Sequence, residues 1–523
     1  MKKKTTKKPK INTSLQKIVT GTSIIFIGLL ISLFFGLLSR VLIARYWTET
    51  QFGIYSLAYS ILSICTIISS LGFNQGIPRS IAFSRGEKNY KKIRGFISSS
   101  IYLAIIASII VGLVLFLASE FIAVEIFHEP ALIMPLQIFS IAVPFFTLIE
   151  IIIAIFRGFD QVKQTILYEQ IILSILFLVL ILAIITLDQP FINIFYAGVA
   201  SFVIASIFLV NYSFKQIKTM KIIKIKSIVS PAAKELLVFS IPLLGTAMLN
   251  MIITWTDTLM LGGMKTAADV GLYNVSHNLA YLVSFPLGAL LIIYIPIFSG
   301  LYAKKKFDEI KTNFIIITKW LCSFTLPLFI FLFLFPQQVI QFLFGANYVF
   351  AADALRILSF GFIINNYVGP CGVTLVTMGR SKFIMFATLA TAIMNIVLNT
   401  FLIPVYGIMG AAIASATSLV SINIIKSIKL YSISGVQPIS KNLLKPTFIS
   451  LLLIIPAYLY CQSTLEITWI ILIGLFIAFY VIYLFVFLLT KSVDEEDLNM
   501  IKMLEKKPGG NITKIRHFLS RYT

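Results

Sequence analysis

Long apolar runs separated by short polar links follow one another along most of the chain. A helix needs about 20 consecutive, mainly apolar residues to cross a bilayer. Fourteen segments approach or exceed this length, at 20–43, 52–72, 97–118, 132–156, 166–187, 191–211, 237–262, 274–300, 314–335, 353–378, 383–403, 408–430, 446–462 and 467–490. The links between them are shorter than the roughly 50 residues that an independent soluble domain needs. The pattern predicts an all-α polytopic membrane protein with about 14 transmembrane helices.

Two parts of the chain repeat one local pattern. A run that carries Arg40 near its end is followed by a Gly-apolar-Tyr turn at Gly53, and a run that carries Asp257 is followed by the same turn at Gly271. Weaker matches at offsets of 217 to 221 residues extend the similarity over about 120 residues. Span one pairs with span seven, so the two halves run in the same direction. Such a parallel repeat predicts a substrate site between the halves.

The repeat and the polar links divide the chain into six parts. They are a basic cytoplasmic N-terminus at 1–19, an N-lobe of six spans at 20–211, a cytoplasmic linker at 212–236, a C-lobe of six spans at 237–430, two extra spans at 446–490 and a cytoplasmic amphipathic tail at 491–523. The first apolar run lacks a small-residue cleavage site, so we expect a retained span rather than a signal peptide.

Positive charge is concentrated on one side of the predicted membrane. The chain has 43 lysines and arginines against 21 acidic residues, a net charge of +22. With the N-terminus inside, 39 of the 43 fall in inner segments, as the positive-inside rule requires. We therefore expect a multi-pass protein of the cell membrane with both termini in the cytoplasm. The dispersed charge argues against nucleic-acid binding, and the four cysteines and three histidines have no metal-site spacing.

Ionisable side chains inside spans are costly and usually face a cavity or the interior of a bundle. We single out five of them as candidates, Arg40, Glu150, Glu169, Asp257 and Arg356. An arginine that faces a cleft can bind phosphate oxygens in a bidentate manner. For Arg40 and Arg356 the alternative is an arginine that reaches back to the outer interface.

Arg79 lies at the inner end of span two. It is either a charge that sets the topology or a group that meets a phosphate entering from the inner leaflet. Arg40, Arg79 and Arg356 are thus the candidate residues for a cationic substrate cavity.

Asp257 and Arg40 stand opposite each other in the repeat, with opposite charges. One hypothesis is that they approach each other when the outer mouth closes and form a gate. The alternative is that Asp257 pairs locally with Asn250 or Thr254.

Glu150 and Glu169 lie near the inner ends of spans four and five. They are candidates for carrying a coupling proton, and the simpler interpretation is that they pair with Arg157 or Lys163. No cofactor is expected beyond a coupling ion, H+ or Na+.

Asn395 and Asn399 are four residues apart and share one face of span eleven. Their amides can bond either a neighbouring helix or a sugar hydroxyl, and helix packing is the favoured role.

Several of these motifs resemble the polysaccharide-biosynthesis flippases of the multidrug/oligosaccharidyl-lipid/polysaccharide (MOP) exporter superfamily. The similar residues are Asn395-x3-Asn399-x2-Leu402-Ile403-Pro404-x-Tyr406-Gly407-x2-Gly410-Ala411-Ala412-x-Ala414-Ser415, Phe52-Gly53-x-Tyr55 after Arg40, Pro78-Arg79-x-Ile81-Ala82, Arg157-Gly158, and Asp257 before Gly271-x-Tyr273. The resemblance extends from about residue 20 to 430 and is followed by two further spans, as in many flippases.

The resemblance implies two MATE-like lobes that move a polyprenyl-pyrophosphate-linked oligosaccharide from the inner to the outer leaflet by alternating access. It implies a cationic cavity for the pyrophosphate, with membrane lipids and possible glycosyltransferases or a polymerase of the same pathway as partners. A cation-coupled drug exporter of the same superfamily is the alternative, and the few acids in the N-terminal spans count against it. A multi-span enzyme would need carboxylates in an outer loop, and the longest outer link, 336–352, has none.

Overall fold

The computed structural model describes residues 13–161, 164, 166–219, 232–435 and 468–490, together with most positions from 447 to 459. Every regular element in these residues is helical, and eleven helices are long and apolar enough to cross a membrane. The predicted all-α polytopic fold is therefore confirmed. The predicted tail at 491–523, residues 1–12 and the last part of span thirteen, 460–462, lie outside the described residues.

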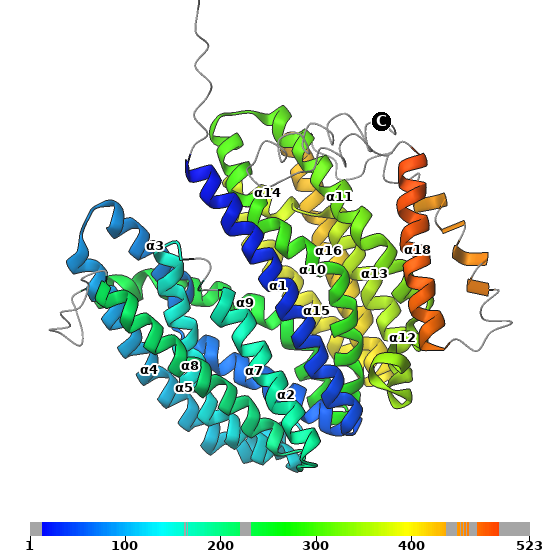
Figure 1. Ribbon diagram of the computed structural model, residues 1–523, viewed down its shortest axis with the longest axis horizontal. Helices are drawn as coiled ribbons and strands as arrows, with labels where there is room; N and C mark the ends of the chain where they lie inside the picture. The colour runs from blue at the N-terminus through cyan, green and yellow to red at the C-terminus, as the bar shows by residue number, and fades with distance from the viewer. Residues whose placement is uncertain are drawn as a thin grey trace, which may run out of the picture.

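The helices form two bundles, with α1 running between them (Figure 1). The first half contains α1 (Thr13–Tyr46), α2 (Glu49–Ser69), α3 (Phe73–Gly86), α4 (Tyr90–Phe121), α5 (Ile133–Gly158), α7 (Leu173–Thr186) and α8 (Asn193–Thr219). The second half contains α9 (Ala232–Met264), α10 (Ala267–Ala303), α11 (Phe307–Leu334), α12 (Pro336–Phe344), α13 (Ala352–Val368), α14 (Cys371–Thr377), α15 (Ser381–Tyr406) and α16 (Ile408–Ser434).

The two bundles have corresponding centres. In the first, α5 packs against α2, α3, α4 and α8, and in the second, α13 packs against α10, α11 and α16. The later helix α18 (Trp469–Leu489) packs on α11 and α12, at the edge of the second bundle (Figure 1). We call the end of the molecule where α1 begins the inner end, and the end where α1 stops and α2 begins the outer end, following the predicted orientation.

The repeat is clearest where α2 and α10 begin. Each helix starts with a capping box, in which a threonine hydroxyl accepts the backbone N–H of the third helical residue. The pairs are Thr48 with Gln51, at 3.3 Å, and Thr266 with Asp269, at 3.2 Å. Both members of the second pair follow their counterparts by 218 residues.

This register corrects the expected match between Arg40 and Asp257. At an offset of 218 residues, the counterpart of Asp257 is Ser39, the residue before Arg40. One residue corresponds to about 100° of rotation around a helix. Arg40 and Asp257 therefore point in different directions from their respective helices.

The helices also extend beyond the predicted apolar runs. For example, α10 begins at Ala267 rather than 274, and α11 begins at Phe307 rather than 314. Polar first turns continue a helix outside the bilayer, and hydropathy does not detect them. Lys319, which charge counting assigned to an inner link, lies within α11 and is only 2% exposed.

Span ten was predicted as one continuous segment, and the structure breaks it into α13 and α14. The break falls at Gly369, whose φ of +56° is in the left-handed region, followed by Pro370. Proline has no backbone N–H to donate, so the helix cannot continue through this point without losing a hydrogen bond.

Candidate functional site: a cavity between the halves and a buried carboxylate

A cavity of about 480 Å³ lies between helices of the first half and α10 of the second. Its wall includes the described residues Leu29, Ser32, Leu33, Gly36, Leu37, Ser39, Arg40, Tyr55, Tyr59, Phe139, Phe146, Ile149, Glu150, Gln170, Leu173, Ser174, Phe177, Gly198, Ser201, Phe202, Asn278, Tyr281, Leu282 and Phe285. Most are apolar or aromatic, with a few polar groups between them. A mainly apolar wall with a small number of polar groups is typical of a ligand site.

Arg40 is held in this cavity by a contact between the two halves. Its Nη1 donates to Oδ1 of Asn278 on α10, at 2.9 Å. A guanidinium has five N–H donors in a planar fork, and Asn278 orients this fork by holding one of them. The site is therefore suited to a phosphate or carboxylate, which accepts two parallel hydrogen bonds.

The two other candidate arginines are placed elsewhere. The guanidinium carbon of Arg79, an exposed residue on α3, lies 4.4 Å from the centre of the Phe239 ring on α9. Arg356 donates to Asp353, at 2.6 Å, and to the carbonyl oxygen of Phe333, at 3.2 Å. Neither residue belongs to the cavity wall described above. Of the three candidate arginines, Arg40 belongs to the cavity wall given above.

Like Arg356, two other cations near the outer end donate to carbonyl oxygens close to the C-terminus of a helix. Arg45 donates to the carbonyl oxygens of Phe342 and Leu343, in the last turn of α12. Lys265 donates to the carbonyl oxygen of Pro404, near the end of α15. Cations at helix C-termini satisfy free carbonyls and interact favourably with the helix dipole. Helix capping therefore explains why these cations occur on the side that the positive-inside rule leaves nearly free of them.

Glu150 also lines the cavity, on α5. Its predicted partner Arg157 is exposed at the end of the same helix, and Lys163 and the side chain of Glu169 lie outside the described residues. Glu150 and Arg40 are the charged side chains in the wall given above. The cavity therefore carries one charge of each sign.

Asp257 is a buried carboxylate, 4% exposed, inside the second half. Its Oδ1 accepts from Nδ2 of Asn395, at 3.1 Å, and from Nδ2 of Asn399, at 2.7 Å. Its Oδ2 accepts from the hydroxyls of Tyr273, at 2.7 Å, and Ser415. Four helices, α9, α10, α15 and α16, thus meet at one carboxylate, and hydrogen bonds to the charged form offset much of its desolvation cost.

This network departs from both sequence hypotheses for Asp257. Asn250 and Thr254, the proposed local partners, are exposed. The gate pair with Arg40 is also not formed, because Arg40 donates to Asn278 and Asp257 accepts from its own bundle. The amides of the two asparagines bond a neighbouring helix. Sequence reasoning missed Tyr273 and Ser415 as partners, although both stand in the motifs that carried the family resemblance.

The two halves touch at the outer end through their paired glycines. A Cβ atom added to Gly53 would lie 1.7 Å from the carbonyl oxygen of Ala267, and one added to Gly271 would lie 2.3 Å from that of Glu49. No other residue type allows two helix backbones to approach this closely. The α2–α10 crossing therefore closes the space between the halves on the outer side of the cavity.

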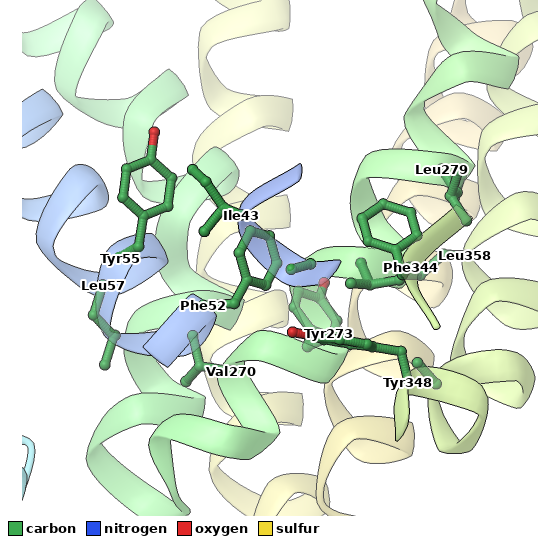
Figure 2. Packing of buried hydrophobic residues seen from close by; sticks show 14 of the residues in the cluster. Ile43, Phe52, Tyr55, Leu57, Val270, Tyr273, Leu279, Phe344, Tyr348 and Leu358 are labelled. Atoms are coloured by element: carbon green, nitrogen blue, oxygen red, sulfur yellow. The ribbon is translucent and has the colours of Figure 1, made fainter. Parts of the chain in front are cut away.

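Large side chains surround this crossing (Figure 2). Phe52 lies between Ile43 of α1 and the two tyrosines Tyr273 and Tyr348 of the second half. The rings of Phe52 and Tyr348 are 6.3 Å apart in an edge-to-face arrangement. This apolar packing adds to the glycine contact at the outer end of the cavity.

The protein has two helical halves that run in the same direction, with a cavity between them that is lined by a few polar groups. This arrangement defines a membrane transporter of the two-lobe class. Residues 18–302 match the family described as "Polysaccharide biosynthesis protein", and residues 242–401 match the family described as "MatE". The chain belongs to the polysaccharide biosynthesis protein family, and the family predicted from the motifs is confirmed.

Curated proteins are similar to this chain in sequence, and solved structures share its fold. Stage V sporulation protein B of Bacillus subtilis is 23% identical over 451 residues, which cover 81% of this chain and 85% of that protein. The probable low-salt glycan biosynthesis flippase Agl15 of Haloferax volcanii is 24% identical over 168 residues, 32% of this chain and 35% of that protein. The inward closed structure of the lipid II flippase MurJ has a TM-score of 0.70 at 16% identity and covers 91% of this chain and 99% of that one. An inward-facing MATE transporter has a TM-score of 0.63 at 15% identity, covering 77% and 94%.

Proposed function

We propose that this protein is a flippase that moves a polyprenyl-(pyro)phosphate-linked oligosaccharide from the inner to the outer leaflet by alternating access. The observation that carries the proposal is Arg40, an oriented guanidinium in a cavity between the two halves of a polysaccharide biosynthesis family member. Two relatives named as flippases, Agl15 and MurJ, support it.

The residues suggest how each part of the substrate is held. Arg40 binds the phosphate that carries the sugar, while Ser32, Gln170 and Ser174 offer hydrogen bonds to sugar hydroxyls. The hydroxyls of Ser32 and Ser174 lie 3.1 Å apart, so one exchange of partners frees them for a sugar. The lipid tail stays in the bilayer. Release to the outer leaflet then requires the α2–α10 crossing to separate.

We also propose that Asp257 holds the coupling ion, H+ or Na+. Oδ1 of Asn399 is buried and has no hydrogen-bond partner among the described residues, although its Nδ2 donates to the carboxylate. A carboxylate beside an unpaired amide oxygen fits a proton or a small hard cation, which prefers oxygen ligands. The ion would supply the energy for transport. Asp257 and its four partners join α9, α10, α15 and α16, so a change of charge there acts on four helices at once.

The proposal places the protein in the cell membrane with both termini in the cytoplasm. Glycosyltransferases or a polymerase that build or extend the same glycan are the expected functional partners. The second candidate is a cation-coupled drug exporter, which is favoured by the MatE match over residues 242–401, including Asp257.

A deletion strain separates these functions. We expect it to accumulate lipid-linked glycan in the inner leaflet, and the intact gene to restore export. Arg40→Gln is expected to lower export by about 10- to 100-fold, because a charge-assisted hydrogen bond is worth about 1.5–3 kcal/mol. Arg356→Gln, which removes a cation outside the cavity, should leave export nearly unchanged. Normal glycan export together with lost drug resistance in the deletion strain would reject the flippase and favour the exporter.

A further inference from the structure

The cavity has an acidic side chain that a purely phosphate-binding site does not need. Glu150, on α5, lines the same cavity as Arg40. Tyr59, on α2, lines the cavity together with both charged side chains. The cavity is therefore bipolar, with one cationic and one anionic side chain in the wall given above.

The dimensions allow one substrate to reach both charges. Along α1, the wall runs from Leu29 to Arg40, which is about 16 Å at 1.5 Å per residue. The volume of about 480 Å³ falls in the range that encloses most of a drug-sized ligand. A phosphate at Arg40 and the sugar attached to it fit within this space. A longer glycan must continue beyond the cavity, so the wall contacts only the part of the glycan next to the phosphate.

We infer that Glu150 selects the charge of the sugar that lies next to the phosphate. A sugar with an ammonium group is favoured, a neutral sugar is accepted through its hydroxyls, and a sugar with a carboxylate is rejected. This inference rests on the proposed flippase function and assigns a substrate class within it. The physical reason is that the carboxylate attracts or repels a charge in a partly dry wall, where water screens it weakly.

The effect is large enough to measure. Two unit charges 4 Å apart in an effective dielectric constant of about 20 interact by more than the equivalent of a tenfold change in an equilibrium constant. Like-charge contact is a general device for excluding the wrong ligand. We therefore expect the amino sugar to be transported at least about 10-fold faster than the acidic sugar.

The full-length protein in liposomes provides the test. Three fluorescent short-chain polyprenyl-pyrophosphate lipids, which carry glucosamine, glucose or glucuronate, are added, and their transfer between leaflets is timed. We expect the wild-type order to be glucosamine, glucose, glucuronate. Glu150→Gln should bring the three rates within about threefold of each other, and Glu150→Asp should keep the order. Glu120→Gln, which changes an exposed carboxylate on α4, is the matched control and should behave as wild type.

The possible failures are distinct. Active transport with equal wild-type rates would overturn the role of Glu150 and leave the flippase function standing. Equal loss of all three activities in Glu150→Gln, with normal folding, would overturn charge selection and favour Glu150 as a coupling group. If the wild-type protein moves none of the three lipids, the proposed function and this inference are both wrong.

Discussion

Replacing Gly53 with alanine is expected to hold the outer end of the protein open. The new Cβ atom would lie 1.7 Å from the Ala267 carbonyl oxygen, and a backbone atom cannot rotate away as a flexible side chain can. The α2–α10 crossing must therefore separate. Overpacking of this kind typically costs about 1–3 kcal/mol, so the closed population should fall by about 10-fold or more.

The measurement is labelling from outside with a membrane-impermeant maleimide. Ser39, a small cavity residue that is 2% exposed, is changed to cysteine as the reporter in a protein whose four native cysteines are replaced. We expect labelling about 10-fold faster in Gly53→Ala than in the reporter alone, together with reduced transport. Gly271→Ala should act in the same way, because its Cβ would lie 2.3 Å from the Glu49 carbonyl oxygen.

Gly288→Ala is the matched control. Gly288 also lies within α10, and a Cβ atom added there meets nothing within 4 Å. This variant should label and transport like the reporter protein. Wild-type labelling and transport in Gly53→Ala would show that the glycine contact does not control the outer end.

Two substitutions of Asp257 should distinguish its contribution to stability from its contribution to ion coupling. In Asp257→Leu, four donors lose this acceptor, and the three buried ones, on Tyr273, Asn395 and Asn399, cost about 1–3 kcal/mol each. We expect a loss of at least ~3 kcal/mol of stability, seen as a lower thermal unfolding midpoint. In Asp257→Asn, one oxygen remains and the hydroxyls of Tyr273 and Ser415 can rotate to accept from the new amide. This variant should keep its fold and lose ion-driven transport by about 10-fold or more.

Transport into liposomes with imposed proton or sodium gradients measures the second effect. Asp308→Asn, on the exposed first turn of α11, is the control and should respond to the gradient as wild type does. A well-folded Asp257→Asn protein that still responds fully to the gradient would remove Asp257 from the coupling mechanism. It would leave the carboxylate as a structural link between the four helices.

The repeat could be found from the sequence, although the residue-by-residue match of the two preceding helices could not. The two Gly-apolar-Tyr turns mark the matching helix starts, and the structure places Gly53 and Gly271 against each other. The preceding charges seemed to match as well, and the capping boxes show that they differ by one residue. A shift of one residue hardly changes an alignment of short motifs. On a helix, however, the same shift turns the side chain by about 100°.

The sequence by itself determined the helical class, the position of most spans and the duplication, and it indicated several of the charges within the spans. The reason is that a bilayer admits only long apolar helices and makes internal charges rare. Only the tertiary structure decided what those charges do. It brought Asp257 to residues 138 to 158 positions away, placed Arg40 and Glu150 in one cavity, and turned Arg356 toward a helix end. These outcomes depend on how separate helices rotate and pack against one another, and local residue patterns do not encode that rotation.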